Sequence, residues 1–406
     1  MKTDARPTLV TFLAALLQGV GGGLGWSLLP PLMPTIASEL GISHAVGGFV
    51  WGAASLGIAL ASPFGGAAVD RFGARRVAGA AMFVGALACA ARALANGPFA
   101  LAALMFLFGL HIGFVAPALP KALAGHVPLN KLARANGTAL LAYTVGTAIT
   151  MLTARTVLAP AFGGWRGAMV AAGVAMAVAG LAWLLLLEDR VALSRHASLR
   201  DVLELTKNPG LRRVAAMHFL LFGGYLALLG LLFRALLETG LEPPRAGLAV
   251  AGWLLSAAAG NFLGPWLSDR VGLRRPFILG GSLLAGTALG LLAIQPSGPS
   301  LYLLGVMALG GGAFAPILLA LPLELPYIGA PRVGAALGLL MLVGQAGGFL
   351  LPVVVGVAAQ HGGFSLALAV LSAVHLLILV PALRLSETGR KASRPAAQVD
   401  FGGAAA

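Results

Sequence analysis

The residues of this chain that could do acid–base or nucleophilic chemistry are few, and their positions argue against catalysis. All thirteen acidic residues lie at the ends of apolar segments or in the loops between them. The sequence contains no H-E-x-x-H, no G-x-x-x-x-G-K-[ST] and no G-x-S-x-G motif. Its single cysteine, Cys89, cannot form an intrachain disulfide. We therefore expect no enzyme activity, no metal site and no cofactor.

One titratable side chain, His111, lies at the middle of an apolar segment. A histidine has an ordinary pKa of about 6.5, so it could pass on a proton or bind an anion when charged. The alternative is a structural histidine that bonds to a neighbouring helix. No carboxylate lies at a comparable depth, which disfavours the proton relay of a standard drug exporter.

Other polar side chains also interrupt apolar segments. Gln18 shares a helical face with Gly22 and Gly25, and Thr147 shares one with Thr144 and Arg155. Polar groups are costly inside a membrane and therefore mark candidate substrate contacts. Arg155 could instead reach the outer interface, and Lys121 the inner one. If both point inward, they form positive stations at the two mouths of a path.

The elements that must position these residues are membrane-length apolar segments. A spanning helix needs about 20 mostly apolar residues. This rule predicts twelve spans, at residues 9–33, 46–68, 77–95, 99–122, 136–158, 166–187, 214–237, 246–267, 276–295, 299–322, 333–356 and 364–384. A charged segment, 188–213, interrupts the series and is predicted to hold a short surface helix. Residues 386–406 are rich in alanine, glycine and charge, and we expect a disordered tail.

The two halves of the chain repeat one another at an offset of 199 residues. GFVAP at 113–117 returns as GAFAP at 312–316, and GGAAVDRFGARR at 65–76 returns within GNFLGPWLSDRVGLRR at 260–275. Arg134 with Val145–Gly146 matches Arg332 with Val343–Gly344 at an offset of 198. Matches at one period indicate a duplicated bundle.

The repeated charged turn resembles the loop between the second and third helices of major facilitator superfamily transporters. That pattern is G-x-x-x-D-R-x-G-x-R-R, and Gly66, Asp70, Arg71, Gly73, Arg75 and Arg76 fill every position. The second copy supplies Asp269, Arg270, Gly272, Arg274 and Arg275, with Pro265 where a glycine is expected. The resemblance extends over residues 8–385.

The resemblance implies an all-α membrane protein of twelve transmembrane helices in two pseudo-symmetric six-helix bundles. The bundles would be residues 1–187 and 214–385, joined by a cytoplasmic loop at 188–213 and followed by a cytoplasmic tail. The charged turns would act as a cytoplasmic gate. Asp70 would face the helix that begins near Val333 and Asp269 the one near Asn136, each attracted by the helix dipole. The alternative is a solvated turn that only follows the charge rule.

The family's cavity lies between the two halves, which yields the candidate substrate-path residues. These are Gln18, His111, Thr147, Arg155, Tyr225, Asn261 and Gln345. We treat His375, in the last span, as structural.

Composition places the chain in a lipid bilayer. Its 406 residues are 59% hydrophobic and only 10% charged, whereas soluble domains are about 25% charged. With a cytoplasmic N-terminus, Arg92, Arg155, Arg166, Arg234 and Arg245 lie outside and the other 22 of 27 basic residues inside. This bias accounts for the net charge of +14 without a nucleic-acid partner. We expect a monomer of the inner (plasma) membrane with both termini cytoplasmic.

The favoured function is a secondary transporter that moves a small polar or anionic organic solute by alternating access. Its partners would be that solute and a coupling proton or counter-substrate, because no loop is long enough to hold an ATPase domain. The stretch 117–137 is also faintly similar to nitrate-, cyanate- and monocarboxylate-type members. The alternatives are efflux of a hydrophobic or drug-like compound, a transport-inactive receptor or scaffold, and an intramembrane enzyme.

Overall fold

The computed structural model describes residues 6–188, 204–295, 298–325 and 328–389. Side chains are not described for residues 129, 130, 133, 299, 329, 330 and 331–334. Within the described part every regular element is helical. Eleven helices there are long and apolar enough to cross a membrane. The last of them runs over 49 residues and breaks at Gly362–Gly363, where Gly363 has a φ of 62°. The broken helix makes two crossings, so the twelve predicted spans agree with the structure.

The N-terminal half opens with a long, interrupted span. Its elements are α1 (Arg6–Leu17), η1 (Gln18–Trp26), α2 (Leu29–Leu40), α3 (His44–Phe72), α4 (Ala74–Ala91), η2 (Arg92–Leu94), α5 (Pro98–His126), α6 (Leu129–Thr153), η3 (Ala154–Leu158), α7 (Ala159–Ala161) and α8 (Trp165–Leu186). Segments η1 and η3 are π-helical, a geometry that often marks functional places in helices. The first span continues to Leu40 rather than ending near residue 33, because Pro30 and Pro31 occupy the first helical turn of α2, where proline is tolerated.

The C-terminal half repeats the pattern. It comprises α10 (Pro209–Glu238), α11 (Pro243–Val271), α12 (Arg275–Ile294), η4 (Gly298–Tyr302), α13 (Leu303–Glu324), α14 (Gly329–Leu377) and α15 (Leu379–Leu383). Most of the predicted linker and its short helix, at residues 189–203, lie outside the described residues, as do tail residues 390–406.

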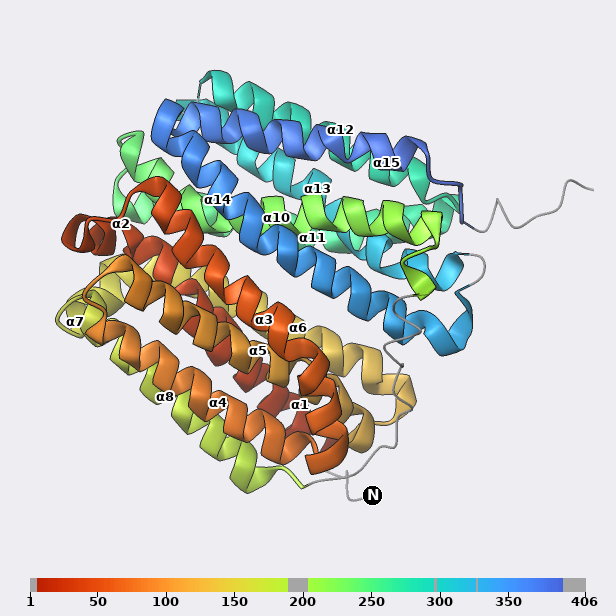
Figure 1. Cartoon of the computed structure of the whole chain (residues 1–406), viewed down its shortest axis with the longest axis horizontal. Helices are drawn as coiled ribbons and strands as arrows, with labels where there is room; N and C mark the ends of the chain where they lie inside the picture. The colour runs from red at the N-terminus through yellow and green to blue at the C-terminus, as the bar shows by residue number, and fades with distance from the viewer. Residues whose placement is uncertain (1–5, 189–203, 296–297, 326–327, 390–406) are drawn as a thin grey trace, which may run out of the picture.

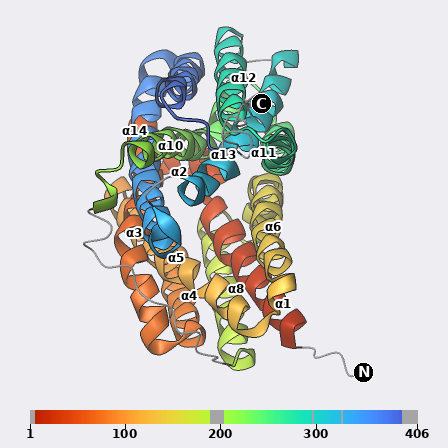
Figure 2. The same ribbon diagram turned by 90° about the vertical axis from the view of Figure 1, so that its right-hand side faces the viewer.

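The helices form two bundles that lie side by side (Figure 1). Seen from the right-hand side of that view, α3 faces α14 on one flank and α6 faces α11 on the other (Figure 2). We call the end with Arg6, Phe72 and Val271 the terminal end. The other end, with α2, α7 and the start of α3, is the distal end. The bundles lie close together at the distal end and diverge toward the terminal end (Figure 1).

Small residues allow close helix packing in each bundle. A Cβ added at Gly65 of α3 would overlap the carbonyl oxygen of Gly113 in α5, and one at Gly264 of α11 would overlap that of Ala313 in α13. Gly65 and Gly264 are related by the 199-residue offset. In lipid, helices associate through such close packing, since water does not drive it. The duplicated sequence therefore produces the same helix contact twice.

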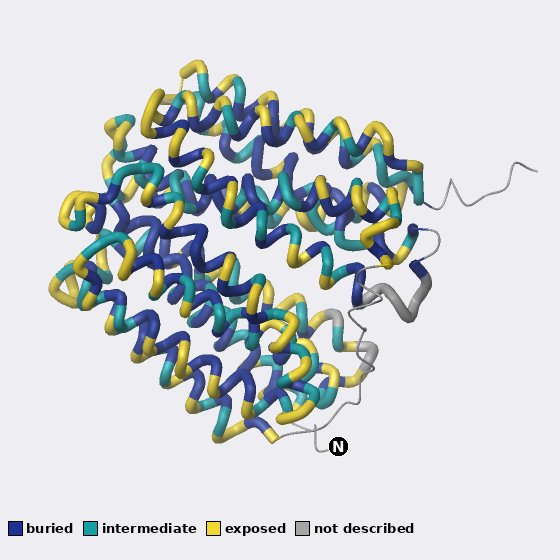
Figure 3. Tube along the Cα trace, viewed as in Figure 1, coloured by how far each residue is buried: buried dark blue, intermediate teal, exposed yellow. Residues whose placement is uncertain are grey.

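The outer surface is apolar, as a bilayer requires. Buried residues follow the middle of each bundle, and exposed ones line its outside (Figure 3). Large apolar side chains such as Phe99, 80% exposed, and Ile294, 82% exposed, face outward. With no water in the hydrocarbon to satisfy exposed backbone groups, helices suit this environment.

Candidate functional site

The first charged turn is anchored within the N-terminal bundle. Asp70, near the end of α3, forms an ion pair with Lys121 of α5, and both side chains are largely shielded from solvent. The Nε of Arg75 donates to the carbonyl oxygen of Leu184 in α8 at 2.6 Å. Gly73 has a φ of 84°, a conformation that favours glycine and explains its place in the motif. Arg76 is exposed and Gly66 has open space around its Cα.

The second charged turn has richer contacts. Arg274 pairs with Asp269 at 2.5 Å and with Glu324, at the end of α13, at 2.7 Å. These hydrogen bonds to carboxylates raise the pKa of the Arg274 guanidinium, Glu324 contributing most. Gly272, like Gly73, has a positive φ, of 78°. Arg275 donates to the Leu383 carbonyl at 2.7 Å.

The two turns share a further detail. Arg71 lies 5.1 Å from the ring centre of Phe72, and Arg270 lies 5.1 Å from that of Trp266. The side chains at residues 329–334, where the predicted partner of Asp70 begins, lie outside the described part. The cross-bundle gate therefore stays a prediction.

Polar side chains from both bundles meet near mid-depth. Tyr143 of α6 lies within reach of Thr147, one turn away on the same helix, and of Tyr225 of α10 in the other bundle. The Thr147 hydroxyl accepts from Ser27 at 3.2 Å, which ties α6 to the first span. Tyr225 stacks on Trp253 of α11, with ring centres 5.3 Å apart. Hydroxyl groups and aromatic faces are thus presented where the bundles join.

The first span fits against α6 through glycine. A Cβ added at Gly23 would lie 2.8 Å from the Cα of Gly146, and one at Gly22 would lie 2.6 Å from the Tyr143 ring. Gln18 is partly buried at the start of this π-helical segment, with its Oε1 close to Gly22. Gln18, Thr147 and Tyr225, all predicted path residues, therefore surround Tyr143, which sequence reasoning missed.

A second polar group lies in the C-terminal bundle. Gln345 of α14 is buried, and its Oε1 has no hydrogen-bond partner among the residues that the structure describes. His218 of α10 lies against Gly344, which precedes Gln345 in α14. The His218 ring also stacks on that of Phe222, with ring centres 5.6 Å apart. The Nδ1 of His218 is likewise buried without a partner among the described residues. Two incompletely satisfied polar side chains on neighbouring helices are suited to binding a ligand. The available signal for His218 was a histidine within an apolar segment.

His111 lies inside the N-terminal bundle rather than between the bundles. Its Nδ1 contacts the Phe108 carbonyl oxygen, and its ring is 4.4 Å from the Phe108 ring. Only 2% of the residue is exposed, because Gly21 and Gly85 let neighbouring helices approach the ring. This environment is that of a structural histidine.

Arg92, which the sequence placed at the outer surface, is fully buried in the N-terminal bundle. Its Nη1 donates to the Gly25 carbonyl at 2.9 Å, and its guanidinium lies 4.1 Å from the Phe108 ring centre. Nε and Nη2 have no hydrogen-bond partner among the described residues. No acidic residue is among its described contacts. Its apolar surroundings gave no signal that could be read from one sequence.

The remaining predicted path residues lie apart from this meeting point. Arg155 is partly buried in η3 toward the distal end, and its Nη1 has no partner among the described residues. Lys121 lies at the terminal end, where it pairs with Asp70, so it and Arg155 are at opposite ends of the molecule, and their place in a substrate path stays a prediction. Asn261 is exposed on α11. His375 is buried and bonds to its own helix at Leu371.

Comparison with known proteins assigns the family. The sequence profile of the Major Facilitator Superfamily matches residues 15–325 and 214–404. The chain belongs to the major facilitator superfamily. It is 27% identical to the probable nitrate/nitrite transporter NarK2 of Mycobacterium tuberculosis, covering 82% of this chain and 84% of that protein. It is 25% identical to the gentisate transporter of Corynebacterium glutamicum, covering 93% and 88%.

A solved structure shares the fold. A bacterial homologue of the human lysosomal transporter Spinster, in an inward-facing and unoccupied conformation, superposes with a TM-score of 0.79. The superposition covers 94% of this chain and 96% of the Spinster homologue, at 16% sequence identity. The predicted fold class, two six-helix bundles of the major facilitator type, is confirmed, and the chain is an integral membrane protein.

Proposed function

We propose that this protein is a secondary transporter that moves a small organic anion across the membrane by alternating access. The observation that carries the proposal is the polar meeting point of Tyr143, Thr147 and Tyr225, which both bundles build. Distal to it the bundles are packed together, and toward the terminal end they diverge. A site that can be reached from one side only is what alternating access requires.

The closed side is defined by specific contacts between bundles. The Nε1 of Trp51 donates to the Leu226 carbonyl at 2.8 Å, and Phe49 contacts Phe349 edge to face with ring centres 6.0 Å apart. A Cβ on Gly48 would overlap the Pro352 carbonyl oxygen. The described state is therefore closed at the distal end, while the helices of the two bundles diverge toward the terminal end (Figure 1). We propose that the terminal end faces the cytoplasm, because the basic residues gather there.

The anionic substrate is favoured by charge. The polar groups of the meeting point and of the neighbouring Gln345–His218 pair are hydroxyl, amide and imidazole groups, and no carboxylate is among the described contacts of these residues to bind a cation. The relatives named above are transporters of nitrate/nitrite and of gentisate, a carboxylate. We further propose a monomer of the inner membrane that is driven by a proton or by exchange.

The test is transport by the purified protein in liposomes. Radiolabelled gentisate, benzoate and nitrate, and a lipophilic cation, would each be offered to liposomes with and without a pH gradient. Saturable uptake of an organic anion, competed by unlabelled anion, is expected. The double variant Tyr143→Phe/Tyr225→Phe should lower the affinity for this anion. Movement of the cation alone would favour drug efflux instead, and no movement of any solute would favour a receptor or scaffold.

A further inference from the structure

Two surfaces outside the meeting point of the bundles carry further inferences. The first is a hollow of about 400 Å³ at the terminal end of the C-terminal bundle. Three arginines, Arg212 and Arg213 of α10 and Arg384 just after α15, line it together with apolar residues, and no acidic residue lines it among those that the structure describes. Such a concentration of positive charge at the surface of a membrane protein favours the binding of an anion.

The position of two of these arginines near the N-terminus of α10 also favours a bound anion. Arg212 and Arg213 lie in the first turn of α10, which contains no acidic residue. Positive side chains are unfavourable at a helix N-terminus, because the backbone already carries partial positive charge there. A bound phosphate would interact favourably with the helix terminus and with the guanidinium groups together.

The apolar part of the hollow points to a lipid rather than to free phosphate. Leu220 follows Arg212 by eight residues on α10, which places it about 12 Å deeper along the helix axis. On the facing wall, Leu377 and Val380 are 52% and 48% exposed. Charge at one level and apolar side chains about two turns deeper match the headgroup and acyl chains of one phospholipid.

We propose that this hollow binds an anionic phospholipid of the leaflet at the terminal end. The phosphate lies between Arg212, Arg213 and Arg384, and an acyl chain follows Leu220 and Leu377. The site is separate from the substrate path, so it holds whatever the substrate proves to be.

Native mass spectrometry with phosphatidylglycerol and phosphatidylcholine tests this site. The parent protein should retain phosphatidylglycerol in preference, and each arginine replaced by glutamine should weaken binding about fivefold. The matched variants are Arg212→Gln/Arg213→Gln and, as control, Lys131→Gln/Arg134→Gln, which removes two exposed charges near the same end of the other bundle. Equal loss in both doubles would overturn the site, because general charge would then explain the preference. Competition by inorganic phosphate at an equal concentration would show a phosphate site and overturn the lipid assignment.

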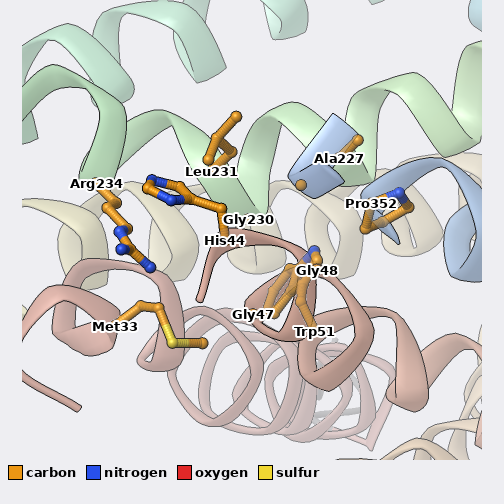
Figure 4. Close-up of a pocket in the computed structure, with 11 residues that line it drawn as sticks. Met33, His44, Gly47, Gly48, Trp51, Ala227, Gly230, Leu231, Arg234 and Pro352 are labelled. Carbon is orange, nitrogen blue, oxygen red and sulfur yellow. The ribbon is translucent and has the colours of Figure 1, made fainter. Parts of the chain in front are cut away.

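A different observation, at the distal end, carries a second inference. His44 opens α3 in one bundle and Glu238 closes α10 in the other, and the Nε2 of His44 lies 3.0 and 3.1 Å from the two carboxylate oxygens. Arg234, one turn earlier on α10, donates to the same carboxylate at 3.0 Å. Figure 4 shows His44 and Arg234 approaching each other from opposite bundles. Two basic groups therefore share one carboxylate across the bundle interface.

Among the described residues around this cluster, the histidine is the side chain whose ordinary pKa lies nearest to neutral pH. Beside it is a cavity of about 30 Å³, whose other lining residues from α2, α3, α10 and α14, Met33, Gly48, Leu231 and Pro352 among them, are uncharged except for Arg234. Such a volume accepts about two waters. The Glu238 side chain is 43% exposed, so protons reach the cluster from the distal side.

We propose that His44, Glu238 and Arg234 form a proton-dependent lock that holds the distal end closed. A histidine changes charge between about pH 5 and 8. When protonated, His44 joins the bundles by a charge-assisted bond. When neutral, it contributes only an ordinary hydrogen bond, while Arg234–Glu238 stays within α10. The lock is therefore strongest at low pH and weakens as pH rises. This proposal rests on the alternating movement proposed above.

Spin-label distances can separate the lock from the movement. In a Cys89→Ala background, labels at Ser38→Cys of α2 and Leu248→Cys of α11 report the distal separation, both positions being exposed. From pH 5.5 to 8.0 the open-to-closed ratio should rise about two- to fivefold. His44→Gln should abolish this pH dependence, and His44→Lys should hold the closed state at both pH values. His361→Gln, which alters another exposed distal histidine, should leave the dependence intact.

The outcomes are distinct. A pH dependence that persists in His44→Gln would overturn the lock, as would a distance that responds to substrate but not to pH. A distance that never changes, with pH or with any substrate, would overturn the alternating movement and the lock with it.

Discussion

Arg92 is a charged side chain enclosed by apolar neighbours, with one hydrogen bond and one aromatic contact. Burying a charge is costly, and replacing it by an apolar residue of similar length is often neutral or stabilising. We predict that Arg92→Met keeps the midpoint of thermal unfolding in detergent or raises it. Arg92→Ala also leaves a cavity beside Phe108 and should cost about 2–4 kcal/mol. An equal loss of stability in Arg92→Met and Arg92→Ala would show that the charge itself stabilises the bundle.

Asp70 offers a test of the gate. Asp70→Asn keeps the shape of the side chain but removes the charge that faces Lys121. We predict at least a tenfold loss of the transport rate in liposomes, with unchanged elution in size-exclusion chromatography. The control is Glu188→Gln, whose ion pair with Arg6 is solvent-exposed at 66% and 55% and should matter little. Full transport in Asp70→Asn would remove the gate role.

The depth of a single residue along its span was predictable from sequence, whereas the role of such residues in a substrate path stays a prediction. Thr147, Tyr225 and Gln18 lie near mid-span, and the structure gathers them around Tyr143. Rotation about the helix axis was the missing information. Without it, His111 could not be placed inside one bundle, nor Asn261 on an exposed face.

Among the elements, α12 has an unusual N-terminus. The Glu387 carboxylate accepts hydrogen bonds from the backbone N–H groups of Arg274 and Arg275 at 2.6 and 3.1 Å. Thr388 and Gly389 donate to it at 3.0 Å. A segment near the end of the described chain thus caps the ninth span, where negative charge is favourable. Composition alone predicts disorder from residue 386, because the segment is rich in alanine, glycine and charge.

This cap should make stability depend on pH. Burial by itself would raise the pKa of the Glu387 carboxyl, but the four N–H donors lower it below its ordinary value of 4.5. A lowered folded-state pKa gives stability that is present above the ordinary value and lost as pH falls through the folded one. Glu387→Gln should therefore lower the unfolding temperature at pH 7, which corresponds to a loss of about 1 kcal/mol in the free energy of unfolding. The difference between variant and parent should shrink below pH 4.

Thermal unfolding of parent and variant at pH 7 and pH 3.5 measures this effect. Glu242→Gln, which removes an exposed carboxylate that caps no helix through its side chain, is the matched control and should show no such change. A difference between Glu387→Gln and the parent that stays the same at both pH values would contradict the cap.

Helix boundaries show where sequence reasoning reaches its limit. Hydropathy located all twelve crossings, but it measures only the apolar part of each helix. Helices α3, α5 and α10 extend to polar residues such as His44, His126 and Glu238, because water at the membrane surface solvates side chains without ending a helix. The π-helical segments η1 and η3 have no composition signal beyond the glycines of η1.

For the whole molecule, the duplicated sequence was the most informative feature. Matching turns at one offset required two similar bundles, and the structure repeats even the Gly65 and Gly264 contacts. Which end of the molecule is open could not be predicted. Under the proposed alternating access, one sequence populates two states whose free energies differ by only a few kcal/mol. Charge and packing at the two ends decide the balance.

Gly48 tests that balance at the closed end. A side chain there would overlap the Pro352 carbonyl oxygen of the other bundle, whereas Gly47, its neighbour on α3, meets only a side-chain atom of Ile42 at 3.8 Å. Gly48→Val should hold the distal ends of α3 and α14 apart, and Gly47→Val should not. If the bundles alternate as proposed, this wedge should raise the fraction of molecules open at the distal end and slow transport at least tenfold. The spin-label pair on α2 and α11 measures the first effect and liposome uptake the second. Identical distance distributions in the two valine variants would mean that contact at Gly48 does not control closure.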